Sequence, residues 1–93
     1  MSTLTRERNF DLIRLILMEL EKSPLDSVVT NSDLKIEGYD PLQIAFHVEM
    51  LADASFIEAK IPKVMGGMLS DFIVKKILWA GYEFLDNAKN NTI

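Results

Sequence analysis

The chain has 93 residues and a net charge of −4, with 48% hydrophobic residues, 26% charged residues and no cysteine. This length predicts a single domain over residues 1–93, with an ordered core from about residue 6 to residue 89. The lack of cysteine excludes disulfides, thiolate metal sites and cysteine nucleophiles. The N-terminus, MSTLTRERNF, has no apolar signal segment, and no apolar run approaches the ~20 residues of a membrane span. We therefore expect a cytoplasmic protein without membrane contact.

A first helix is predicted from Arg6 to Lys22. Thr5 is its candidate N-cap, and Ser23-Pro24 ends it, because the residue before a proline is pushed out of helical geometry. A broad apolar stripe recurs at helical spacing: Phe10, Leu12, Ile13, Ile16, Leu17 and Leu20. So broad a stripe indicates a helix covered on more than one side. Either a partner subunit covers one side, as in a homodimer, or the helix lies at the centre of its own core.

A loop over Leu25–Asn31 is followed by a predicted short strand from Asp33 to Glu37. In that stretch Leu34 and Ile36 alternate with charged residues, which is the pattern of a half-buried strand. The segment between the two long helices has room for this strand or for one short helix, and hardly for both. A full helix-turn-helix motif would require that extra helix, so a strand in this segment excludes a full helix-turn-helix motif.

A second helix is predicted to begin after Asp40 and to end near Ala54. Asp40 is a favoured N-cap residue, and Pro41 then occupies the first helical position, where its missing N–H costs nothing. One face is apolar at helical spacing and is predicted to be buried: Ile44, Ala45, Val48, Leu51 and Ala52. The helix runs directly into a strand that begins at Phe56, an arrangement typical of the recognition helix and wing of winged-helix proteins.

The stretch from Phe56 to Ile77 predicts a β-hairpin, because alternating and β-branched residues flank Gly66-Gly67, a pair suited to a tight turn. A last helix is predicted from Leu78 to Asn87. The elements together predict an α+β, winged-helix-like fold: helix, short strand, helix, β-hairpin wing and C-terminal helix. Its predicted core consists of Ile13, Leu17, Leu20, Ile44, Val48, Leu51, Ile57, Val74 and Trp79.

Four stretches together resemble a family of small uncharacterised bacterial and prophage proteins: FDLIRLILMELE, IEGYDPLQIAFHVEMLADASFIEA, the predicted hairpin and LWAGYEFLDNAKN. The family pattern reads DLIRxILLxIE, GYxxxxIxYHLxLLxEAGLIE and LTWxGHEFLD. The second stretch is also similar to the end of the recognition helix in MarR- and PadR-type regulators. The resemblance implies a winged-helix-like fold and a phage or prophage setting, and it implies no activity. Three positions depart from the pattern, because Ser55 replaces a glycine, Leu78 a threonine and Tyr82 a histidine.

No constellation predicts catalysis, a cofactor or a metal. His47, the only histidine, lies beside the core face and has no second histidine or cysteine to act with, so we expect it to be structural. Glu49 and Asp53 lie four residues apart on one helical face, which could hold a divalent ion but is more typical of a solvated face. No nucleophile motif and no phosphate loop is present. We therefore expect a protein that is not an enzyme.

Two binding hypotheses remain. As a DNA-binding transcription regulator, the protein would contact double-stranded DNA phosphates through basic residues of the wing and N-terminus and a base through Gln43. The candidate phosphate contacts are Lys60, Lys63, Lys75, Lys76, Arg6 and Arg8. The second helix carries no lysine or arginine, which disfavours DNA and favours a protein-interaction module. Its partner surface, or homodimer surface, would consist of Phe46, Met50, Met65 and Met68.

Overall fold

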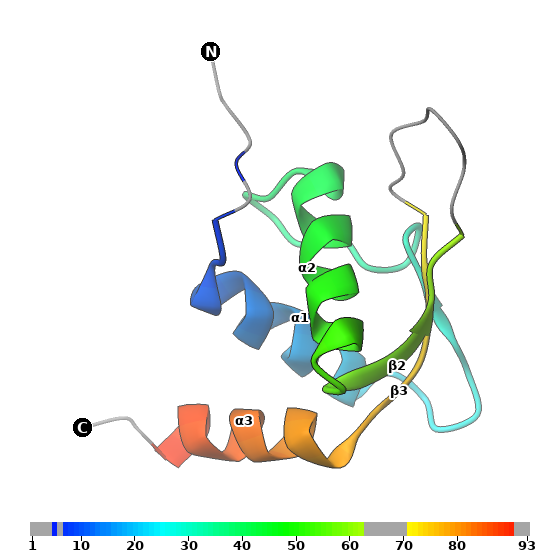
Figure 1. The fold of residues 1–93 in the computed structure, drawn as a ribbon. Helices are drawn as coiled ribbons and strands as arrows, with labels where there is room; N and C mark the ends of the chain where they lie inside the picture. Colours follow the sequence, from blue (N-terminus) through cyan, green and yellow to red (C-terminus); the bar gives the residue numbers. More distant parts are fainter. Residues whose placement is uncertain (1–4, 6, 63–70, 91–93) are drawn as a thin grey trace.

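The computed structural model describes Thr5, residues 7–62 and residues 71–90, without the side chains of residues 89 and 90. In chain order its elements are α1 (Phe10–Lys22), β1 (Val29–Thr30), α2 (Pro41–Asp53), β2 (Ile57–Lys60), β3 (Ile73–Ile77) and α3 (Trp79–Asn90). Within this part of the chain, three helices and one three-stranded antiparallel sheet make an α+β fold (Figure 1). The predicted class and the order helix, strand, helix, hairpin, helix are confirmed.

The first helix begins later than predicted. Asn9, and not Thr5, is the N-cap of α1, and its side-chain oxygen accepts a hydrogen bond from the Leu12 N–H at 3.0 Å. The broad apolar stripe is covered within the chain, because α1 packs against α2, α3 and β3. Only Phe10 at the edge of the stripe is exposed. The structure thus supports the central-helix alternative for α1.

The short strand lies earlier than predicted, at Val29–Thr30, and the prediction of a strand over Asp33–Glu37 is wrong. The Asp33 carboxylate accepts hydrogen bonds from the backbone N–H and the hydroxyl of Thr30, each at 3.1 Å. The N–H groups of Asp33 and Leu34 in turn donate to the Thr30 carbonyl. These bonds close a turn that keeps residues 33–37 out of the sheet. Leu34 still reaches the core, so the alternating pattern reflected burial correctly but not backbone geometry.

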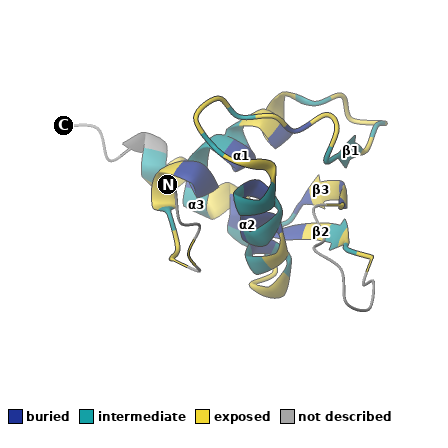
Figure 2. Cartoon of the chain, turned by 90° about the horizontal axis from the view of Figure 1, so that it is seen from above, coloured by how far each residue is buried: buried dark blue, intermediate teal, exposed yellow. Residues whose placement is uncertain are grey.

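The three strands are ordered β1-β3-β2, so β3 lies in the centre of the sheet. Val29 pairs with Val74 from one side, and Ala59 pairs with Val74 from the other. A bulge interrupts the β2–β3 register between Glu58 and Ala59, and it leaves Lys75 without an opposite residue on β2. Helices cover one face of the sheet, and the dark-blue residues of α1, α2 and β3 in Figure 2 mark the shared core.

The end of α2 is a Schellman motif. The Phe56 N–H donates to the Leu51 carbonyl at 2.9 Å, and the Ser55 N–H donates to the Ala52 carbonyl at 3.1 Å. This geometry places Ser55 at φ 64°, the left-handed conformation that glycine adopts without steric cost. The serine side chain at this position therefore carries the steric cost that a glycine would avoid.

The last helix runs from Trp79 to Asn90, later at both ends than the predicted Leu78–Asn87. Its inner side is set by Gly81, where a Cβ atom would collide with the Phe56 carbonyl oxygen and the Ile77 side chain. Leu85, one turn later, is buried on the same side. Trp79 therefore points outward and is 79% exposed, so its assignment to the core is wrong.

The other predicted core residues are all buried. The core also includes residues beyond the predicted set, contributed by α1, the 31–39 segment, β3 and α3: Leu12, Ile16, Leu34, Phe72, Ile77 and Leu85.

Replacing Ser55 by glycine is expected to stabilise the fold by about 0.5–1 kcal/mol, because a non-glycine residue in the left-handed region costs roughly 1 kcal/mol. Urea denaturation measures this change. Ser32→Gly is the control, since Ser32 lies in an exposed turn without positive φ, and glycine there should lower stability or leave it unchanged. Equal effects at both positions would show that Ser55 is not strained in solution.

Candidate interaction surface

The outward side of α2 carries no positive charge. We call it the α2 face, defined by Leu42, Phe46, Glu49, Met50 and Asp53. Glu49 and Asp53 are exposed, while Phe46 and Met50 are half-buried. Phe46 and Met50, which belong to the predicted partner surface, are thus only partly accessible. The result is a helix face of apolar side chains with two carboxylates near its centre and C-terminal end.

A buried histidine fixes the N-terminal segment against α2. His47 is 0% exposed, and its Nε2 atom accepts a hydrogen bond from the Asn9 backbone N–H at 2.9 Å. Its Nδ1 atom lies 2.9 Å from the Gln43 carbonyl oxygen. Because Nε2 accepts, the proton lies on Nδ1 and is donated to that carbonyl. Both ring nitrogens of His47 therefore form hydrogen bonds with backbone atoms, which agrees with the structural role expected for this histidine.

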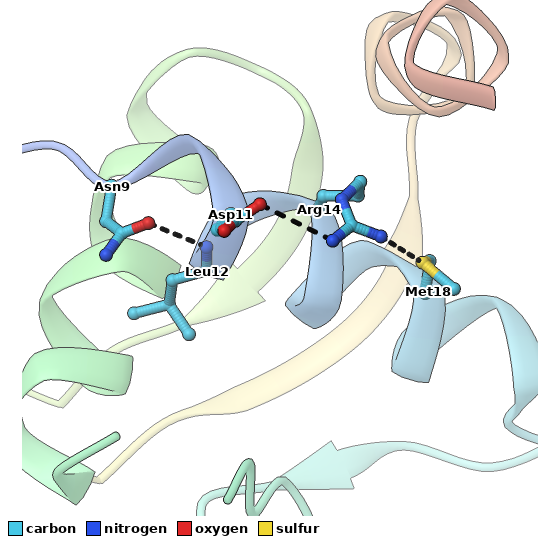
Figure 3. Close-up of polar contacts among 5 residues, drawn as sticks. All are labelled: Asn9, Asp11, Leu12, Arg14 and Met18. Carbon is cyan, nitrogen blue, oxygen red and sulfur yellow. Dashed lines mark hydrogen bonds and ion pairs between the residues drawn. The ribbon is translucent and has the colours of Figure 1, made fainter. Parts of the chain in front are cut away.

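Asn9 connects this histidine to α1. Its backbone N–H binds His47, while its side chain caps the first turn of α1 (Figure 3). Sequence reasoning missed this residue, although an asparagine directly before an apolar helical stripe is an ordinary N-cap signal. The consequence is that residues 7–9 lie beside the first turn of α2.

This placement brings Arg8 and Gln43 together. Both line a polar hollow of about 340 Å³ that also contains Thr5, Glu7, Asn9 and Phe10. The Arg8 guanidinium lies 4.6 Å from the centre of the Phe10 ring, and Phe10 stacks on Phe84 of α3. The predicted base contact and one predicted phosphate contact are therefore neighbours, although Glu7 opposes the charge of Arg8.

The described lysines of the hairpin do not join this cluster. Lys60 is exposed near the far end of β2 from α3, and it has no ion pair among the described residues. Lys76 pairs with Glu58 at 3.7 Å. Lys75 and Lys76 line a different hollow, between the end of α1 and α3. Four further candidates lie outside the described residues: Arg6, Lys63, Met65 and Met68.

The exposed side of α1 is closed by its own side chains. Arg14 reaches Asp11 at 3.4 Å and the Met18 sulfur at 3.5 Å, as Figure 3 shows. The arginine thereby covers the apolar Met18 with a polar group. Together with the packing of α1 inside the chain, this leaves no broad apolar stripe on α1 for a partner subunit.

The described residues contain no group of three or more His, Cys, Asp or Glu side chains that could hold a metal ion. Glu49 and Asp53 are exposed to solvent, as the simpler interpretation of this pair expected. Another hollow, of about 420 Å³ and mostly apolar, opens between the 31–39 segment, α2 and Phe72. Among the described helices, none is long and apolar enough to cross a membrane.

Residues 7–93 match a protein family described as "Hypothetical protein (DUF2513)". The chain belongs to the DUF2513 family. A protein of Haemophilus influenzae (strain ATCC 51907 / DSM 11121 / KW20 / Rd), named "Uncharacterized protein", is 34% identical over 89 residues, which cover 94% of this chain and 71% of the relative. No solved structure matches significantly. The resemblance to a family of uncharacterised proteins is thereby confirmed.

In this DUF2513 protein, His47→Leu should lower the free energy of unfolding by about 1–3 kcal/mol. Leucine keeps most of the buried volume, so the loss reflects mainly the Asn9 N–H left without a partner. Chemical denaturation gives the energy, and NMR hydrogen exchange should show faster exchange of the Asn9 amide.

Asn9→Ala is the matched control. It removes the side-chain cap of α1 but keeps the backbone N–H, so the amide of residue 9 should stay protected. An unchanged Asn9 amide in His47→Leu would contradict the proposed bond.

Proposed function

We propose that this protein is a non-enzymatic, winged-helix-type domain that binds a protein partner through the α2 face. The strand order β1-β3-β2 supports the winged-helix interpretation, as does the direct passage from α2 through one turn into the β2–β3 hairpin. In this interpretation α2 is the recognition helix and the hairpin is the wing. The segment between β1 and α2 forms turns where a helix-turn-helix would carry another helix.

The charge of the α2 face is the observation that favours a protein partner over DNA. α2 has no lysine or arginine, and Glu49 and Asp53 are exposed on its outward side. Duplex DNA carries one negative charge per roughly 1.7 Å of its axis, so a helix in the major groove would bring both carboxylates close to phosphates. A protein surface with apolar and basic side chains complements the same face. This charge argument outweighs fold analogy, which is a weak guide to function.

DNA binding is the second candidate, favoured by a basic residue beside the start of α2 and another on the hairpin. Arg8 lies beside Gln43, and Lys60 lies on the hairpin. Such contacts would hold phosphates and give weak sequence specificity. As a regulator, the protein would then bind DNA through its flanks, with α2 itself contributing little. A phage or prophage setting, implied by the resemblance alone, fits either candidate.

Fluorescence anisotropy with a random DNA duplex at 50 and 200 mM salt separates the two candidates. The protein-partner proposal expects no salt-sensitive binding. If binding occurs and weakens steeply with salt, Lys60→Glu should reduce it, while Lys35→Glu serves as a control in the loop before α2. Salt-sensitive binding that Lys60→Glu reduces would support DNA binding over the protein-partner proposal.

A photoreactive residue at Leu42 provides the direct test of the protein partner. The crosslinked protein is identified from host cells, purified and titrated by calorimetry. Glu49→Lys should weaken its binding at least about tenfold, because a charge on the contact face is reversed. Glu19→Lys on α1 is the matched control and should bind as the wild type does. Equal affinities of the two variants would contradict the assignment of the α2 face.

A further inference from the structure

A pair of exposed aromatic residues on α3 has no role in the α2 face. Trp79 is 79% exposed and Tyr82 is 44% exposed, and their three-residue separation places them on one side of the helix. Glu83 and Asp86 are exposed and continue the same side one and two turns later. Gly81 and Leu85 hold the opposite side of α3 against the domain, so the aromatic side cannot turn inward.

A hollow of about 310 Å³ lies next to Tyr82. It opens between α3, the end of α1 and β3, and its lining includes Leu20, Pro24, Leu25, Lys75, Lys76 and Tyr82. Leu25 is fully exposed at its rim. Lys75, at the β-bulge, has no ion pair among the described residues. Glu21 lines the hollow as well, so its lining carries two lysines and one carboxylate beside the apolar side chains. The excess of positive charge and the apolar side chains suit an aromatic ring flanked by carboxylates.

We propose that this surface binds a second copy of the chain, with Trp79 of each copy inserted into the hollow of the other. A two-fold dimer needs one self-complementary patch on each subunit. Here the projecting ring and the hollow adjoin each other through Tyr82, so one rotation can satisfy both contacts. Burying a tryptophan in a pocket is also the commonest form of an interface anchor.

Charge complementarity favours a second copy over other occupants. Glu83 and Asp86 follow Trp79 on the helix that would enter the partner, and Lys75 lines the hollow that would receive it. Lys76, beside it in the lining, already pairs with Glu58. Each copy thus supplies the acidic and the basic half of the contact. Nucleic acid fits this surface less well, because the two carboxylates share it with the lysines.

Trp79 is the only tryptophan of the chain, so it reports directly on this contact. Sedimentation of the full chain from low micromolar to about 1 mM should show a monomer–dimer equilibrium. Tryptophan emission should shift to shorter wavelength as the dimer forms. Trp79→Ala should raise the dissociation constant at least about 30-fold, the loss typical of an anchor residue. Because the ring is exposed in the monomer, this variant should fold normally.

Charge variants test the orientation of the two copies. Lys75→Glu should weaken the dimer, and adding Glu83→Lys to it should restore part of the affinity. Lys35→Glu makes the same change in charge away from α3 and should leave the dimer intact. A wild-type protein that stays monomeric at about 1 mM would overturn the proposal. A dimer that survives Trp79→Ala unchanged would overturn it as well, by placing the contact elsewhere.

Discussion

The junction at Phe56 holds the three structural parts of this domain together. Its N–H closes the end of α2 on Leu51, and its carbonyl accepts a hydrogen bond from the Leu78 N–H at 2.8 Å, directly before α3. Gly81 lies against the same carbonyl, because only a residue without a side chain fits there. The Phe56 ring contacts Phe84, which stacks on Phe10 at the start of α1. One residue thus sets the positions of α2, the hairpin and α3, and a chain of rings extends its influence to α1.

That junction also decides which surfaces face solvent. Since α3 must present Gly81 and Leu85 to the domain, Trp79 and Tyr82 are turned outward. The packing of the core also decides which side of α2 faces solvent. The carboxylates of Glu49 and Asp53 face outward, because four other residues of the helix are buried: Ile44, His47, Val48 and Leu51. The two candidate surfaces are therefore consequences of how the core is packed. The start of α2 lies at the opposite end of the domain from α3, while the end of α2 lies close to α3 (Figure 1).

Local signals were sufficient for much of the fold. Asp40-Pro41 set the start of α2, helical spacing identified most of the core, and Gly66-Gly67 with its flanking strands predicted the pairing of β2 with β3. The errors occurred where a specific contact, tertiary in one case and local in the other, overrides the pattern of apolar residues. Trp79 is apolar and at helical spacing, yet the close approach at Gly81 rotates it out of the core. The alternation at 33–37 yields to the side-chain bonds of Asp33, which close a turn instead.

In the candidate site, too, some features could be predicted from the sequence and others could not. The missing positive charge of α2 was visible in the sequence, because it depends on composition and helical phase alone. Which basic residues lie together was not, because Arg8 reaches Gln43 only through the bond between Asn9 and His47. Lys75 and Lys76 are close to Lys60 along the hairpin, but the bulge and the course of β3 direct them to the hollow beside α3. The described candidate basic residues thus lie apart, with Arg8 beside the start of α2 and Lys75 and Lys76 beside α3, and α2 itself carries no lysine or arginine. This separation is the main physical reason to assign α2 to a protein partner and the lysines beside α3 to contact between two copies of the chain.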